Sequence, residues 1–146
     1  MGIFESLDDV YSQEDLDLFF KIAAPNIPAG TGPNLDLING ATAPNGPDDA
    51  GGESNLDFDM VYPIIYPQQT TLFQVKGGGN DDIFGDFLAA IDKEYCNEDP
   101  THKPGYNCGV FEPTNVISIS YGGDEDPSDL AGIKVRFSCT ESHHTR

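Results

Sequence analysis

Two carboxylates, Glu53 and Asp57, lie four residues apart in the run GESNLD at residues 52–57. On an α-helix this spacing places both side chains on one face, where they can share a proton or a hydrogen bond. Such carboxyls do not ionise independently. One titrates low and the other high, which provides a general base beside a neutral hydrogen-bond donor in acid. The spacing alone favours a merely exposed pair, because acidic residues are common in the first turns of helices.

The helix that must carry this pair is expected over residues 53–63, after a glycine pair and before Pro63. Leu56 and Met60 are predicted to form its apolar face. Asp59 lies two residues beyond Asp57, hence on another side of the helix, and is assigned to the solvated surface.

A preceding helix is expected over residues 12–25, which open with a capping serine and acidic residues and end at Pro25. Its apolar positions recur at helical spacing on one face: Leu16, Phe19, Phe20 and Ala23. A further helix is expected over residues 83–91. The stretch from Asn26 to Gly52 is otherwise interpreted as loop, since it is crowded with Pro, Gly, Asn and Asp.

Short strands are expected at residues 35–38, 70–75 and 115–120. Strands that alternate with helices imply a mostly parallel sheet with crossover helices, and therefore an α/β fold in one domain. Tyr121 and Gly122 follow the last strand, at the edge of the sheet where ligands bind in such folds, and are candidate substrate-binding residues. An ordinary turn after a strand explains them equally well.

The chain carries 25 acidic and 7 basic residues, for a net charge of -18 and a pI near 4.1. This balance argues against a nucleic-acid partner or an anionic membrane surface. It fits either a solvated acidic surface or a protein that works at low pH. No run reaches the ~18 apolar residues of a membrane span, and the first residues lack the basic start and apolar run of a signal peptide.

Cys96 and Cys108 bracket a polar loop at residues 97–107, and a disulfide closing that loop is expected, as suits a secreted protein. Cys139 is left over. No metal site is expected, because the three histidines show no ligand spacing with the cysteines: His102, His143 and His144.

Four runs occur in the order and rough spacing seen in the sedolisins, a family of acid-acting serine-carboxyl peptidases that includes tripeptidyl peptidases, and look closest to its fungal secreted members. They are DLDLF at 15–19, APNIP at 24–28, GESNLD at 52–57 and VISISYG at 116–122. The resemblance covers about residues 1–127 and implies a subtilisin-like α/β scaffold, a peptide or protein substrate and an extracellular location. It also implies that Glu53 is the general base toward a serine and that Asp57 orients Glu53 and shares its proton. A carboxylate base stays unprotonated at lower pH than imidazole, so hydrolysis shifts to acid.

The sequence departs from the family pattern after residue 122. The nucleophilic serine in a Gly-Thr-Ser context and the aspartate of a Ser-Gly-Asp turn are not found, and Glu141 only weakly echoes that aspartate. Residues 123–131 are too few for a crossover helix before the apolar run at 132–137. The family's calcium site near its C-terminus is absent as well, so no cofactor is expected.

Residues 1–127 are therefore interpreted as the N-terminal portion of a peptidase catalytic domain and residues 128–146 as a divergent tail. The chain alone is expected to be inactive, and both a tripeptidyl peptidase and an endopeptidase are compatible as its parent. Two alternatives stay open. One is a non-catalytic fragment that binds peptides or acts as a decoy, and the other is a truncated chain whose exposed sheet edge aggregates.

Overall fold

The computed structural model describes residues 1–77 and 82–122. The expected tail at residues 128–146, with Cys139, Glu141 and two of the histidines, lies outside this part of the chain. The described elements follow one another as β1 Gly2–Glu5, α1 Gln13–Ala23, β2 Asn34–Ile38, the 3-10 turn η1 Pro47–Asp49, α2 Gly52–Ile65, β3 Thr71–Val75, α3 Ile83–Ile91, α4 Lys93–Glu98 and β4 Ile117–Ile119.

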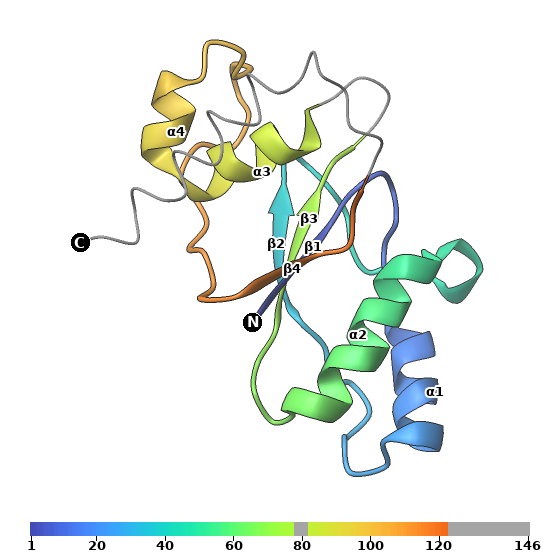
Figure 1. The fold of residues 1–146 in the computed structure, drawn as a ribbon. Helices are drawn as coiled ribbons and strands as arrows, with labels where there is room; N and C mark the ends of the chain where they lie inside the picture. The colour runs from blue at the N-terminus through green and yellow to red at the C-terminus, as the bar shows by residue number, and fades with distance from the viewer. Residues whose placement is uncertain (78–81, 123–146) are drawn as a thin grey trace.

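The four strands form one parallel sheet in the order β2-β3-β1-β4, so the predicted α/β fold with a parallel sheet is confirmed. β1 lies inside the sheet, paired with β3 on one side and β4 on the other, and all of its residues are buried. Helices α1 and α2 lie together on one side of the sheet and α3 and α4 on the other (Figure 1). Helices on both sides are what a buried parallel sheet requires.

Alternate residues of β1 and β3 point into two separate cores, because successive side chains of a strand face opposite sides of the sheet. On the side of α1 and α2, the first core includes Ile3, Leu16, Phe20, Phe58, Tyr62 and Leu72. On the side of α3, the second core includes Phe4, Ile38, Phe73, Val75, Phe87 and Ala90. The Phe87 ring packs edge-on against Phe4 and Phe73, with centroids 5.1 and 5.4 Å apart. The two neighbouring strands therefore link both cores.

Most predicted elements are confirmed. Ser12 caps α1 by accepting a hydrogen bond from the Asp15 amide at 3.3 Å, and the helix ends just before Pro25. The strands β2 and β3 and the helix α3 also occupy the predicted segments, whereas β4 is shorter than expected. The strand β1 was not predicted, since four residues at the chain start give too short a pattern to recognise.

α2 differs from the prediction in its end and in its buried face. The helix continues through Pro63 to Ile65. A proline in the last turn removes one backbone hydrogen bond, but this loss does not end the helix. The predicted apolar face was wrong, since Leu56 and Met60 are 52% and 58% exposed. The buried positions are Ser54, Phe58 and Tyr62, because two aromatic rings bury more apolar surface than Leu and Met do.

The expected cysteine loop begins as the helix α4, which contains Cys96. The structure joins Cys96 to Cys108 by a disulfide with Cα atoms 5.6 Å apart. Just beyond it, the amides of Gly109 and Val110 donate to the carbonyls of Ala89 and Ala90, both at 2.8 Å. The disulfide therefore fastens the loop back onto the end of α3.

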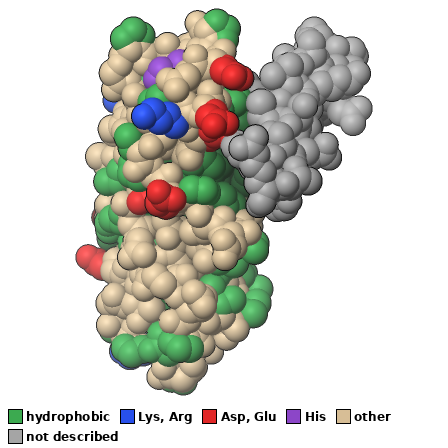
Figure 2. Space-filling view, turned by 90° about the vertical axis from the view of Figure 1, so that its left-hand side faces the viewer, with side chains coloured by type: hydrophobic (Ala, Val, Ile, Leu, Met, Phe, Trp, Pro, Cys, Tyr) green, Lys and Arg blue, Asp and Glu red, His purple; other side chains and the backbone are tan. Residues whose placement is uncertain are grey.

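One face of the molecule carries both acidic and hydrophobic side chains on its surface. Acidic side chains are scattered over the face that Figure 2 shows, with hydrophobic side chains exposed between and below them. Among the described helices, none has the length and apolar character needed to cross a bilayer.

Removing the disulfide tests how much it contributes to the stability of the fold. The double variant Cys96→Ser/Cys108→Ser is expected to lose about 2–3 kcal/mol of unfolding free energy, because the loop is no longer closed in the unfolded chain. Urea unfolding followed by circular dichroism measures the loss. Reduced wild-type protein is the control and should match the variant. A variant as stable as the oxidised protein would show that the bond contributes nothing.

Candidate active site

The segment after β1 positions the start of α2. Leu7 and Asp8 take left-handed backbone angles, with φ of 57° and 60°, which costs about 1–2 kcal/mol per residue and turns the chain sharply. Asp9 then accepts a hydrogen bond from the Ser54 amide at 2.9 Å. The N-cap residue Gly51 has no side chain to do this, so Asp9 supplies the capping acceptor from another segment.

Gly51 is needed for this arrangement. A Cβ atom at Gly51 would overlap the carboxylate and backbone of Asp9. The Gly51 amide donates to the Val10 carbonyl at 2.8 Å, and the side chain of Gln74 holds the Asp9 carbonyl at 3.2 Å. The beginning of α2 is thus fixed to the sheet by contacts with β3 and with the turn after β1.

The predicted pair Glu53 and Asp57 lies in the first two turns of α2. Glu53 is exposed, and Asp57 is partly buried. The Ser120 hydroxyl, directly after β4, donates to the Asp57 carboxylate, with Oγ 2.9 and 3.2 Å from its two oxygens. This contact places the pair at the carboxyl edge of the parallel sheet, where α/β folds bind their ligands.

Glu5, the last residue of β1, is a third carboxyl at this edge, and it was not predicted from the sequence. Its side chain is fully buried, and neither carboxyl oxygen has a hydrogen-bond partner in the part of the chain that the structure describes. Desolvation, and then the charges of Asp57, Asp9 and Glu53, raise the pKa of Glu5 from 4.5 to about 8. Glu5 is therefore protonated at neutral and acidic pH.

Tyr121 fixes β4 to the end of β1. Its hydroxyl accepts from the Ser6 amide at 2.7 Å and donates to the Ser6 carbonyl at 2.9 Å. Its ring meets Phe4 edge-on at 5.2 Å. Burial raises the pKa of Tyr121 to about 12, so the phenol stays neutral.

The two predicted substrate-binding residues, Tyr121 and Gly122, differ in whether they are free to contact a ligand. The Tyr121 hydroxyl is hydrogen-bonded to the backbone of Ser6, just after β1, whereas Gly122 is exposed with open space where a Cβ would lie. Both follow β4 at the same edge of the sheet as Asp57 and Ser120. A role of Tyr121 and Gly122 in binding substrate stays a prediction.

The expectation that Asp59 lies on the solvated surface is wrong. It is partly buried, and its Oδ1 is buried with no hydrogen-bond partner among the described residues. Burial, and then the charge of Asp15, raise the pKa of Asp59 to about 6. Helix α2 packs beside α1, which carries Asp15, so this charge acts on Asp59 (Figure 1).

The arrangement can hold and transfer protons. An exposed carboxylate, Glu53, lies one helical turn from Asp57, and the charges of both act on the buried, protonated Glu5. Among the described residues, no hydroxyl is hydrogen-bonded to Glu53. A carboxylate at the end of a buried strand, as in GIFES at residues 2–6, is the sequence signal that could have identified Glu5.

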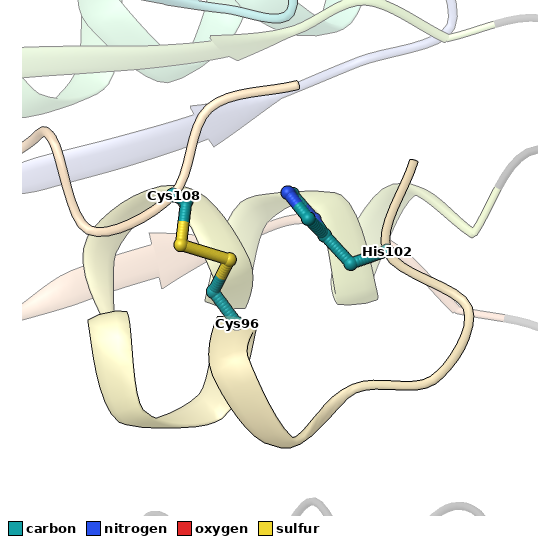
Figure 3. A group of neighbouring side chains, drawn as sticks. All are labelled: Cys96, His102 and Cys108. Carbon is teal, nitrogen blue, oxygen red and sulfur yellow. A yellow bond between two sulfur atoms is a disulfide. The ribbon is translucent and has the colours of Figure 1, made fainter. Parts of the chain in front are cut away.

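A second group of side chains has the residue types of a metal site. The ligand atoms of Cys96, His102 and Cys108 lie within 4.8 Å of one another, although His102 shows no regular sequence spacing with the cysteines. His102 lies beside the disulfide, in the loop after α4 (Figure 3). The two sulfurs are bonded to each other and are not thiolates, the form that binds metals. Sulfur and nitrogen donors also do not suit calcium, which prefers oxygen ligands.

Comparison with known proteins shows which proteins this chain is similar to. No protein-family model matches the chain, and no solved structure matches it significantly. The chain is 45% identical over 159 aligned residues to tripeptidyl-peptidase sed1 of Aspergillus fumigatus and 44% identical over 163 to aorsin of Aspergillus oryzae. It is 33% identical to tripeptidyl-peptidase SED1 of Arthroderma otae.

Each of these matches covers 97% of this chain and 24% of the relative, so the chain spans about a quarter of the length of these curated relatives. The relatives are sedolisin-family peptidases from fungi. The resemblance inferred from four short runs thus extends over nearly the whole chain, whose homologues are serine-type peptidases of the sedolisin family.

Proposed function

We propose that this chain supplies the carboxylate half of the active site of an acid-acting serine peptidase. Glu53 is the general base and Asp57 its orienting partner. The observation that carries the proposal is the contact of Asp57 with Ser120, which sets the pair at the carboxyl edge of the sheet beside Glu5. The names of the relatives support a peptide or protein substrate.

In the proposed reaction, Glu53 accepts the proton of a serine hydroxyl while the serine oxygen forms a bond to the scissile carbonyl carbon. The protonated Glu53 then gives this proton to the leaving amine as the peptide bond breaks. Water releases the acyl group by the same steps in reverse. Asp57 holds Glu53 in place and shares its proton, and Ser120 orients Asp57 in turn.

The titration of the buried carboxyls supports work in acid. The pKa values of Glu5, Asp59 and Asp36 are all raised, to about 8 for Glu5 and about 6 for Asp59, with burial as the largest cause in each case. The folded chain therefore binds protons that the unfolded chain has already released, and folding is favoured as the pH falls. Protonation also reduces the repulsion within a chain of net charge -18.

The disulfide supports a place outside the reducing cytosol, since such bonds persist in oxidising compartments. An extracellular peptidase is consistent with this bond. The serine nucleophile comes from outside the described residues, and the chain alone is proposed to be inactive.

The role of Glu53 is testable in a chimera in which residues 1–122 replace the matched region of tripeptidyl-peptidase sed1 of Aspergillus fumigatus. Glu53→Gln is expected to lower kcat/KM by about 100- to 10,000-fold at acidic pH, since the general base is lost. Peptide cleavage followed by mass spectrometry measures it. The control Asp59→Asn, on the same helix, should stay near the parent rate. Equal rates for Glu53→Gln and the parent, or cleavage by the isolated chain, would contradict the proposal.

The raised pKa of Glu5 predicts a stability that depends on pH. Between pH 4.5 and about 8 the unfolded chain has lost the Glu5 proton and the folded chain keeps it, so wild-type stability falls as the pH rises through this window. Glu5→Gln removes this loss. The variant should gain roughly 3–5 kcal/mol relative to wild type between pH 4 and pH 8.

Urea unfolding at a series of pH values measures this difference. Glu14→Gln is the matched control, because it is the same substitution at a position of α1 that is exposed. Parallel pH profiles for wild type and Glu5→Gln would show that Glu5 ionises normally in the fold.

A further inference from the structure

The cluster of Cys96, Cys108 and His102 brings two sulfurs and an imidazole together on the α3–α4 side of the sheet. Their ligand atoms lie within 4.8 Å of one another, and the His102 ring extends from its loop toward the disulfide (Figure 3). Nδ1 of His102 is buried and has no hydrogen-bond partner among the described residues. Buried polar nitrogens normally have a partner, so this nitrogen is available as a ligand.

The spacing of these atoms is close to that of a tetrahedral zinc site. Zn–S bonds of about 2.3 Å and Zn–N bonds of about 2.1 Å place the ligand atoms of such a site roughly 3.5 to 3.8 Å apart. Atoms that already lie within 4.8 Å of one another can reach this spacing by rotation of their side chains. The two sulfurs are bonded to each other, and this bond must break before they can bind an ion as thiolates.

Contacts that do not involve the disulfide hold the two cysteines in place. Cys96 is buried in α4, and the side chain of Asp92 caps the start of this helix. Directly before Cys108, the Asn107 amide donates to the side chain of Asn39 at 2.8 Å, and the Asn39 amide donates to the side chain of Asn107 at 2.6 Å. Reduction of the disulfide therefore leaves the two thiols close to each other.

His102 is held in the turn after α4. Its amide donates to the Asp99 carbonyl at 3.2 Å. The amide and the hydroxyl of Thr101 both donate to the Asp99 carboxylate, at 2.8 and 2.6 Å. The helix that carries Cys96 thus also positions His102, and these hydrogen bonds do not depend on the disulfide.

We propose that reduction converts this cluster into a binding site for one zinc ion, which the Cys96 and Cys108 thiolates and the His102 imidazole hold. Two thiolates and one imidazole are a ligand set that suits zinc. Three protein ligands leave the fourth tetrahedral position to water. His102 and Cys108 are both partly exposed, so the ion can reach the site from solvent.

The disulfide and the zinc site exclude each other. A dithiol reductant gives two electrons and two protons to the disulfide, so that the S–S bond breaks, both cysteines become thiols and the reductant becomes a disulfide. Zn²⁺ then replaces the two thiol protons, which pass to solvent. Because the ion joins the same segments as the disulfide, it holds the loop on α4 whenever the chain is reduced.

The experiment reduces the chain with a dithiol, removes the reductant without air, and adds Co²⁺ and then Zn²⁺. Every sample carries Cys139→Ser, so that Cys96 and Cys108 are the only cysteines. The reduced chain is expected to form a 1:1 complex with sulfur-to-cobalt charge-transfer absorption, which zinc abolishes. The oxidised chain should show no such absorption. His102→Ala should weaken zinc binding at least about tenfold, since one ligand is lost.

The matched control is His143→Ala/His144→Ala, which removes the other two histidines and should leave the affinity unchanged. Circular dichroism during urea unfolding reports the fold of each sample, and zinc should raise the urea midpoint of the reduced chain. The inference would be overturned by equal affinity for His102→Ala and its parent, by equal binding to the oxidised chain, or by the lack of a 1:1 complex. A reduced chain that stays unfolded with zinc would overturn it as well.

Discussion

The parallel pairing of β1 between β3 and β4 is the constraint on which the rest of the structure depends. It joins two cores through alternate residues and brings the end of β1 beside the end of β4. Tyr121 strengthens this junction with two hydrogen bonds to Ser6. Because Ser120 precedes Tyr121 and reaches Asp57, the same pairing also sets α2 against the edge of the sheet. The site therefore forms where three elements distant in sequence meet.

Burial gives the site its chemistry. The Glu5 side chain is fully buried, and its carboxyl oxygens accept no hydrogen bond from the described residues, so the free energy of its charged form is high. The neighbouring carboxylates add repulsion, and the result is a proton kept at the end of β1. Glu53 is exposed by contrast. The carboxyl edge of the sheet therefore holds a buried carboxyl that keeps its proton and an exposed one that solvent reaches.

The parts that could be predicted from sequence are those with local signals. Ser12 is a typical N-cap residue and so predicts the start of α1. The GESNLD run marks Glu53 and Asp57 as a candidate pair of carboxylates. The buried face of α2 could not be deduced from spacing alone, because Leu56 and Met60 form as regular a pattern as Phe58 and Tyr62. Which face is buried depends on what packs there. Glu5, Asp9 and Ser120 join the site through contacts between distant segments, and no local pattern reports such contacts.

At the carboxyl end of β1, Glu5 keeps its proton because it is buried and lies near the charges of Asp57, Asp9 and Glu53. Carbon-detected nuclear magnetic resonance of the side-chain carboxyls, followed through a pH titration, tests it most directly. The account predicts that Glu5 titrates near its raised pKa of about 8. A Glu5 carboxyl that titrates near its ordinary value of 4.5 would contradict the account, since the buried acid would then be a charge like the others.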